Sequence, residues 1–386
     1  MPDIFSSGST VSASRLEEVC NAFRIPGRLI DYHLITDGNI NTTYKVICES
    51  GSGDSTIRIP YIAQRVNQYV FKDPVQMMHN IDLVTGHIMQ KQTSLGKNDR
   101  RYRLHFHHTA DRKNYYITDN GEFWRLTNFI DDSIGFNSTR DPKVLKMVGK
   151  AFGQFQAQLT DFDASQLTET IPDFHNTRKR LDTLFAHVEE DPCGRCAEMA
   201  EEIEFFYAQK DRCSELSRSY ELGFLPKRVT HNDTKSNNVL LDKDTLEPLV
   251  VIDLDTVMPG LAAYDFGDAV RFAASNAAEN EPDLSKVSLN LELYRAFSEG
   301  YIQATANFLT KEEMETMASG ALTITVELAS RFMDDYITGD KYFKISYPEE
   351  NKVRTRNQIA LAKDMIRHFE EMDRIVEETV QKVKET

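Results

Sequence analysis

The chain has 386 residues, of which 40% are hydrophobic and 27% are charged, the proportions of an ordinary globular protein. Its formal net charge of −15 repels phosphate-coated partners, so nucleic-acid binding is excluded as its main function. No apolar run approaches the roughly 20 residues that a membrane span requires, and we expect no membrane partner. Five cysteines in a chain of this length make no disulfide framework, which favours a reducing, cytoplasmic location.

The distribution of strand and helix patterns divides the chain in two. Ser14 and Glu17 form a capping box that predicts a short helix through Phe23. From Arg28 to about Ile130 the sequence is typical of strands, and from Asp141 onward it is mostly helical. We therefore predict an α+β protein with an N-terminal lobe over 1–130 and a C-terminal lobe over 131–386.

A polar turn between the first two predicted strands is a candidate phosphate contact. It is rich in Asn and Thr and contains one glycine, so its backbone N–H groups can lie over phosphates. An ordinary hairpin turn would have the same composition. The candidate nucleotide-binding residues here are Asp37, Gly38, Asn39, Asn41, Thr42 and Thr43.

The next predicted strand, over 57–66, carries polar side chains at its end. In protein kinases the corresponding strand provides a lysine that pairs with the nucleotide phosphates. This chain offers Gln64 or Arg65 instead, and we include both as candidate nucleotide contacts. Further on, His175 lies in a turn marked by Pro172, where it is either a satisfied turn residue or part of a substrate pocket.

The most informative stretch runs from Arg228 to Asp255. Asp233 stands two residues after His231, Asn238 follows five residues later, and a β-branched run from Val250 to Ile252 leads into Asp253. Phosphoryl transfer from a nucleotide needs one carboxylate for the acceptor hydroxyl, and an Asn and a second carboxylate for the metal. We therefore predict Asp233 as the base, and Asn238 and Asp253 as magnesium ligands.

Two residues near this stretch have alternative interpretations. Lys235 either reaches the γ-phosphate or pairs with Asp233. The string Asp265-Phe-Gly267 resembles the metal-binding string of protein kinases, but it opens a helical run instead of ending a strand. We expect Asp265 and Asp268 to cap that helix or to brace the catalytic loop.

The C-terminal part predicts helices over 291–308, 311–339 and 353–384. Glu327, Arg331 and Asp335 stand at successive i,i+4 positions of the second one. One interpretation is a surface salt-bridge ladder. The other is an arginine that forks around the hydroxyl and carbonyl groups of a neutral sugar.

Several strings together resemble the bacterial N-acetylhexosamine 1-kinases of the aminoglycoside phosphotransferase and choline kinase superfamily. The most specific are 229–235, containing Thr-His-Asn-Asp-Thr-Lys, and 255–260, Asp-Thr-Val-Met-Pro-Gly; others cover 36–44, 167–177, 265–268 and 353–356. The resemblance implies a bilobal protein-kinase-like fold with an N-terminal nucleotide-binding lobe, and we expect ATP between the lobes and the sugar on the helical lobe. It also implies ATP- and magnesium-dependent phosphorylation of the anomeric hydroxyl of N-acetylglucosamine or N-acetylgalactosamine.

The resemblance also implies roles for individual residues. It implies Asp233 as the base and Asp253 at the metal, and it implies sugar contacts by Phe272, Arg331 and Tyr342. One departure is Asn39, where the family pattern has His. The alternatives are a kinase for a cationic alcohol, such as an aminoglycoside or choline, and a pseudokinase that binds ligands without catalysis.

Overall fold

The computed structural model describes residues 11–36, 40–51, 53–96 and 99–385. The chain forms two compact units, Met1–Ser133 and Ile134–Thr386, each of which is described by itself. Strands build the first unit and helices dominate the second, which confirms the predicted α+β class. No helix of the described residues is both long and apolar enough to cross a membrane.

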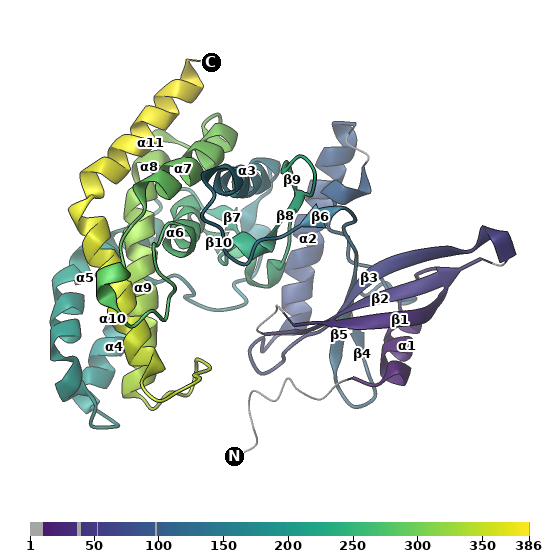
Figure 1. The fold of residues 1–386 in the computed structure, drawn as a ribbon, viewed down its shortest axis with the longest axis horizontal. Coiled ribbons are helices and arrows are strands. Elements are labelled where there is room, and N and C mark those ends of the chain that lie inside the picture. Colours follow the sequence, from purple (N-terminus) through teal and green to yellow (C-terminus); the bar gives the residue numbers. More distant parts are fainter. Residues whose placement is uncertain (1–10, 37–39, 52, 97–98, 386) are drawn as a thin grey trace. The chain divides into compact units, whose positions relative to one another are not determined.

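The first unit is built on a five-stranded antiparallel sheet (Figure 1). Its order is β1 (Arg28–Ile35), β2 (Thr42–Ser50), β3 (Ile57–Arg65), β5 (Phe123–Asn128) and β4 (Tyr116–Ile117). The register aligns Thr43 with Gln64 and Gln64 with Arg125, so polar side chains of three strands lie in one row. A 21-residue helix, α2 (Pro74–Ser94), follows β3 and is capped by Asp73.

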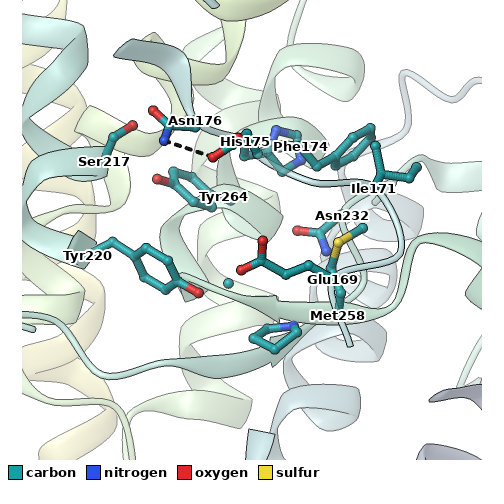
Figure 2. A pocket seen from close by; sticks show the side chains of 13 residues that line it. Glu169, Ile171, Phe174, His175, Asn176, Ser217, Tyr220, Asn232, Met258 and Tyr264 are labelled. Atoms are coloured by element: carbon teal, nitrogen blue, oxygen red, sulfur yellow. Dashed lines mark hydrogen bonds between the residues drawn. The ribbon is translucent and has the colours of Figure 1, made fainter. Parts of the chain in front are cut away.

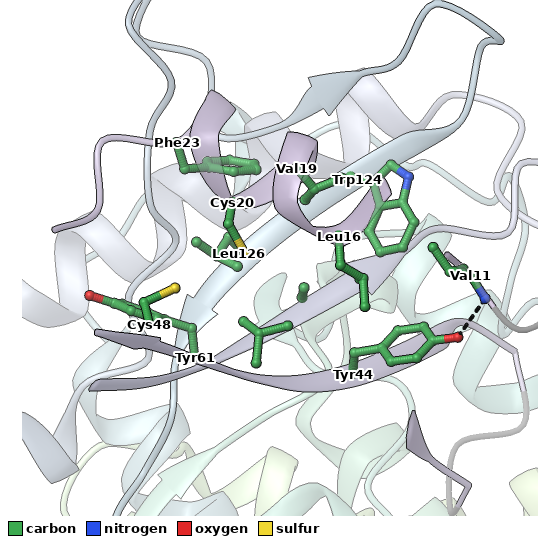
Figure 3. Packing of buried hydrophobic residues seen from close by; sticks show 12 residues of the cluster. Val11, Leu16, Val19, Cys20, Phe23, Tyr44, Cys48, Tyr61, Trp124 and Leu126 are labelled. Atoms are coloured by element: carbon green, nitrogen blue, oxygen red, sulfur yellow. Dashed lines mark hydrogen bonds between the residues drawn. The ribbon is translucent and has the colours of Figure 1, made fainter. Parts of the chain in front are cut away.

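The core of this unit lies between the sheet and α1 (Ala13–Ala22) (Figure 3). Leu16, Val19 and Cys20 of the helix pack with strand residues that include Tyr44 and Trp124. The N-cap of α1 is Ser12, whose hydroxyl accepts from the Arg15 N–H at 3.2 Å. The predicted capping box at Ser14 is therefore wrong: Ser12 has the extended backbone that a cap requires, whereas Ser14 is already helical.

The second unit is organised around α9 (Met317–Ile337), which is buried nearly all round (Figure 1). Its neighbours are α4 (Thr177–Glu190), α5 (Ala200–Glu221), α6 (Ala262–Ala273) and α10 (Glu350–Arg367). A second layer pairs α3 (Pro142–Gln158) with α7 (Leu291–Thr305), and α8 (Lys311–Glu315) and α11 (Phe369–Lys384) complete the helices. The helices predicted over 311–339 and 353–384 are therefore each two helices, interrupted at Thr316 and His368.

Short strands hold the candidate catalytic stretch at both ends. β7 (Arg228–Thr230) pairs antiparallel with β10 (Met258–Gly260), and β8 (Val239–Asp242) pairs with β9 (Pro248–Val251). A further strand, β6 (Ser133–Ile134), lies where the chain passes from one unit to the next. The close approach of α6 to α9 depends on Gly267 and Gly320, because a Cβ on Gly267 would lie 2.4 Å from the Gly320 carbonyl oxygen.

Candidate active site

The catalytic loop, which we define as residues 231–238 between β7 and β8, is held in place by the ring of His231. This ring is fully buried against the edges of Phe152 and Phe155. Its Nδ1 accepts from the Asp233 backbone N–H at 3.2 Å, so the ring proton resides on Nε2 and faces the Ile252 carbonyl oxygen at 2.9 Å. One neutral side chain thereby links the loop to the end of β9.

Two aspartates of α6 bind the backbone of the same loop. Asp265 accepts from the N–H groups of His231 and Asn232 at 2.9 and 2.8 Å. Asp268 accepts from the Thr234 N–H at 2.9 Å. Of the two roles expected for Asp265 and Asp268, capping the helix or bracing the loop, the structure shows the second.

Burial affects these two carboxyls differently. Burial raises the pKa of Asp265 above its usual range, even though it accepts hydrogen bonds from the loop. Burial also penalises the Asp268 carboxylate, but the nearby Arg271 and Lys235 cations outweigh this effect and lower its pKa. Asp268 is thus held as an anion under the loop.

The Asp233 carboxylate has two polar neighbours. Lys235 Nζ lies 2.6 Å from Oδ1, and the Asn238 amide donates to Oδ2 at 3.2 Å and to the Asp233 carbonyl oxygen at 2.8 Å. Burial alone would lower the pKa of Lys235, but the Asp233 and Asp268 carboxylates raise it. The structure thus has Lys235 paired with Asp233, the second of the two interpretations of this lysine.

Asn238 directly precedes β8, and Asp253 lies just after β9, the return strand of the same hairpin. Val239 pairs with Val251, and the Ile252 N–H donates to the Asn238 carbonyl oxygen at 2.9 Å. Because the Asn238 amide nitrogen binds Asp233, its amide oxygen is the atom that can ligate a hard cation. The described residues contain no group of three or more His, Cys, Asp or Glu side chains that could hold a metal.

The predicted nucleotide contacts of the first unit are only partly described. Asp37, Gly38 and Asn39 lie outside the described residues. The Asn41 side chain accepts from the Asn67 N–H at 3.0 Å. Arg65 binds Glu122 at 2.9 Å and the Thr42 hydroxyl at 3.3 Å.

Gln64 connects β2 to a residue that sequence reasoning missed. Its amide nitrogen donates to the Thr43 hydroxyl at 3.0 Å, and its amide oxygen accepts from Arg125 Nε at 2.9 Å. Arg125 is only 1% exposed, so β5 places a buried cation beside Gln64. The signal was one arginine between the apolar residues Trp124 and Leu126, although strand periodicity alone does not say which face is buried.

The C-terminal candidates do not form the predicted salt-bridge ladder. The Glu327 carboxylate receives His175 Nδ1 at 2.9 Å and the Thr177 hydroxyl at 2.7 Å. Asp335 accepts three backbone N–H groups of the following loop, those of residues 341–343. The ladder, one of the two interpretations of these residues, is therefore wrong, because other segments bind both carboxylates.

Arg331 instead lies within a cluster of aromatic rings. Its guanidinium carbon is 5.6 Å from the ring centre of Phe174, 5.7 Å from that of Tyr342 and 5.5 Å from that of Phe343. A guanidinium nitrogen lies 3.4 Å from the Tyr342 hydroxyl. The structure thus brings two predicted sugar contacts, Arg331 and Tyr342, together with Phe174, which sequence reasoning did not select.

Phe272 and His175 lie nearer the catalytic loop. Phe272 follows Asp265 and Asp268 at helical spacing, so it shares the face of α6 that braces the loop. The His175 ring is 5.4 Å from that of Tyr264, and its Nε2 is buried without a hydrogen-bond partner among the described residues.

A pocket opens beside His175 (Figure 2). Its wall comes from the 169–176 loop, the end of α5, Asn232 of the catalytic loop and the β10 strand. Asn232 has a left-handed backbone with φ of 64°, and its amide donates to the Thr256 carbonyl oxygen at 2.9 Å. Asn232, the residue that precedes Asp233, thus forms part of the wall of this pocket.

Comparisons with known proteins identify a family and similar folds. Residues 104–301, just over half of the chain, match the model of the phosphotransferase enzyme family. Among solved structures, a microcompartment-associated aminopropanol kinase has 14% identity and a TM-score of 0.58, covering 94% of this chain and 99% of its own. A spectinomycin phosphotransferase with ADP and spectinomycin has 14% identity and a TM-score of 0.53, with coverages of 92% and 100%.

A choline kinase from Cryptosporidium parvum is similar at 14% identity, with a TM-score of 0.50 and coverages of 89% and 90%. At such identities the likeness concerns the fold. The matches confirm the predicted kinase-like fold with a β-rich N-terminal region and a helical C-terminal region.

Proposed function

This chain belongs to the phosphotransferase enzyme family, and we propose that it transfers the γ-phosphoryl group of ATP to the anomeric hydroxyl of an N-acetylhexosamine. The acceptor is N-acetylglucosamine or N-acetylgalactosamine. The observation that carries the proposal is the fixed catalytic loop, in which His231 and two α6 aspartates hold the backbone around the partly exposed Asp233 carboxylate.

Asp233 acts as the base in this proposal. Its carboxylate accepts a hydrogen bond from the C1 hydroxyl and takes the proton as the new P–O bond forms and the bond to ADP breaks. The Asn238 amide fixes Oδ2, so the carboxylate keeps one orientation. Lys235, at 2.6 Å from Oδ1, can pair with phosphate oxygens once the nucleotide is present.

Asn238 and Asp253 are the residues that would hold magnesium. One amide oxygen and one carboxylate fit this ion, which usually takes one or two protein ligands beside the nucleotide phosphates. When bound, magnesium neutralises charge on those phosphates. On the first unit we assign the nucleotide contacts to the 37–43 turn, Gln64 and Arg65.

Arg331 supports a neutral acceptor over a cationic one. Among the described residues the Arg331 cation forms no ion pair, and it lies among three aromatic rings. A guanidinium can donate to the acetamido carbonyl and hydroxyl oxygens of a sugar, whereas it repels an ammonium group. We assign Arg331, Tyr342 and Phe272 to the sugar.

A substrate panel tests the proposal. ATP consumption is measured with N-acetylglucosamine, N-acetylgalactosamine, choline and kanamycin, and the product is identified by phosphorus NMR. We expect turnover with an N-acetylhexosamine and a phosphate on C1. Turnover only with choline or kanamycin would replace the sugar by a cationic alcohol, and binding of ATP without turnover of any acceptor would indicate a pseudokinase.

A further inference from the structure

Strand β1 leaves one edge of the first sheet open. It pairs with β2 on one side, and no strand or isolated bridge of the described residues lies on its outer side. Proteins protect such an edge with a short strand, a bulge, a proline or a lysine. The opposite edge strand, β4, has only two residues, whereas β1 has eight and contains neither proline nor lysine. The bulge of β1 lies near its start, so residues 31–35 keep a regular backbone that can pair with another strand.

The exposed side chains of β1 are mostly apolar. Ile30, Tyr32 and Leu34 are 37%, 37% and 45% exposed. Tyr32 is aligned with Val46, and Leu34 is aligned with Tyr44, both of which belong to the core of this unit. Directly opposed residues of paired strands share one face of the sheet, so Tyr32 and Leu34 extend the core face to its edge. A further strand beside β1 would cover these side chains.

The sequence of this edge is complementary to itself. In an antiparallel pair, opposed residues point their backbone groups either both towards the partner or both away from it. Two copies of one strand related by a two-fold axis must therefore be centred on a residue. Centring on Asp31 or on His33 would oppose two carboxylates or two imidazoles. Centring on Tyr32 instead places Asp31 opposite His33 of the other copy, and it brings Leu34 to the bulge residue Ile30.

We propose that two copies of this chain associate through β1, in an antiparallel pair centred on Tyr32. The Asp31 and His33 side chains are 53% and 64% exposed, and within one chain their Oδ2 and Nε2 atoms lie 3.2 Å apart. In the dimer each carboxylate also accepts a hydrogen bond from the imidazole of the other copy. The two five-stranded sheets join into one continuous sheet, and Tyr32 and Leu34 are covered. This association is separate from the proposed phosphoryl transfer.

Sedimentation velocity of the full chain, from micromolar to several hundred micromolar, tests the dimer. Leu34→Lys puts a cation on the exposed apolar edge of β1. Ile117→Lys is the matched control, because Ile117 is 48% exposed on β4, the opposite edge strand of the same sheet. Melting curves followed by Trp124 fluorescence confirm that the first unit of each variant is folded.

Charge reversal tests the register. His33→Asp places a second carboxylate opposite Asp31, so this variant repels its own copies. The double variant Asp31→Lys with His33→Lys opposes lysines in the same way. When the two variants are mixed in equal amounts, the carboxylates of one chain face the ammonium groups of the other.

We expect the wild type and Ile117→Lys to form dimers of equal strength. Leu34→Lys should weaken association roughly 2- to 30-fold, because the symmetry changes two cross-strand pairs at once. The mixed charge variants should associate more tightly than either variant alone.

Four results overturn the proposal. The wild type stays monomeric at every concentration, Leu34→Lys associates as the wild type does, both lysine variants weaken association equally, or mixing the charge variants restores nothing. None of these results bears on the proposed phosphoryl transfer, which the substrate panel tests separately.

Discussion

Asp233 differs from the two α6 aspartates beside it because its side chain remains 28% exposed. Asp265 and Asp268 are buried and occupied by backbone N–H groups, so they cannot reach an acceptor. We predict that Asp233→Asn lowers kcat about 10²- to 10⁴-fold, because the variant cannot take the proton. Steady-state kinetics with ATP and an N-acetylhexosamine measure this loss.

The matched control is Asp244→Asn, in the exposed turn between β8 and β9. It makes the same chemical change with no expected effect on turnover. If Asp233→Asn kept more than a tenth of the wild-type rate, Asp233 would not be the base.

Arg331 is a cation, and the carboxylates of its helix neighbours Glu327 and Asp335 bind other segments of the chain. We predict that Arg331→Ala raises the KM for N-acetylhexosamine about 10- to 100-fold, because a charge-assisted hydrogen bond contributes about 1.5–3 kcal/mol. The KM for ATP should stay close to that of the wild type. Arg331→Lys keeps the charge without the planar fork and should recover only part of the affinity. Equal changes in both KM values would contradict a sugar contact.

Within α9, Asp335 fixes the loop that carries two of the aromatic residues around Arg331. Its carboxylate accepts the N–H groups of Lys341, Tyr342 and Phe343 at 2.7, 2.7 and 2.8 Å, and the Asn351 amide at 2.9 Å. An asparagine at this position offers one acceptor oxygen and turns a donor towards N–H groups. We predict that Asp335→Asn lowers the melting temperature and raises the sugar KM more than it lowers kcat.

Asp334→Asn is the matched control, because Asp334 binds His187 at 2.6 Å instead of the loop. It should leave the sugar KM unchanged. Thermal melts and kinetics on both variants separate a local role from general destabilisation. A sugar KM that changes equally in the two variants would show that the loop does not depend on Asp335.

Helix α9 shows which contacts can be predicted from sequence and which cannot. Spacing along one helix tells which side chains can meet, and it correctly places Glu327, Arg331 and Asp335 along one side. It cannot tell which other segments pack there, and His175 and the 341–343 loop take both carboxylates. The catalytic hairpin was easier to predict, because its residues are close in sequence and β8 and β9 hold them in register. The burial of Arg125 and the pocket beside His175 depend on packing between segments distant in sequence, and they could not be predicted.

In the whole chain, the unfolding of each unit can be measured by a different spectroscopic signal. Trp124 is the single tryptophan, and it is fully buried in the core of the first unit (Figure 3). Its fluorescence therefore reports the unfolding of that unit. Helical circular dichroism is dominated by the second unit, which contains nine of the eleven helices in the described residues.

His107 makes the first unit sensitive to acid. Burial, and then the neighbouring His105 and His108, lower the pKa of His107 to about 4. The ring packs against Tyr61 at 5.1 Å and His105 at 4.8 Å, and its buried Nε2 has no hydrogen-bond partner among the described residues. In the unfolded chain a histidine titrates near pH ~6.5, so the unfolded state binds the proton more readily.

The sign of the pH dependence follows from this difference. The stability that the neutral ring contributes is fully present above about pH 6.5 and is lost as the pH falls towards 4. We predict that the urea midpoint reported by Trp124 decreases over this window, and that His107→Phe, which keeps a ring and cannot titrate, decreases less steeply. His33→Phe removes an exposed histidine of the same unit, one that is 64% exposed beside Asp31, and should follow the wild-type curve. Parallel curves for His107→Phe and the wild type would mean that other groups, and not His107, set the acid sensitivity of this unit.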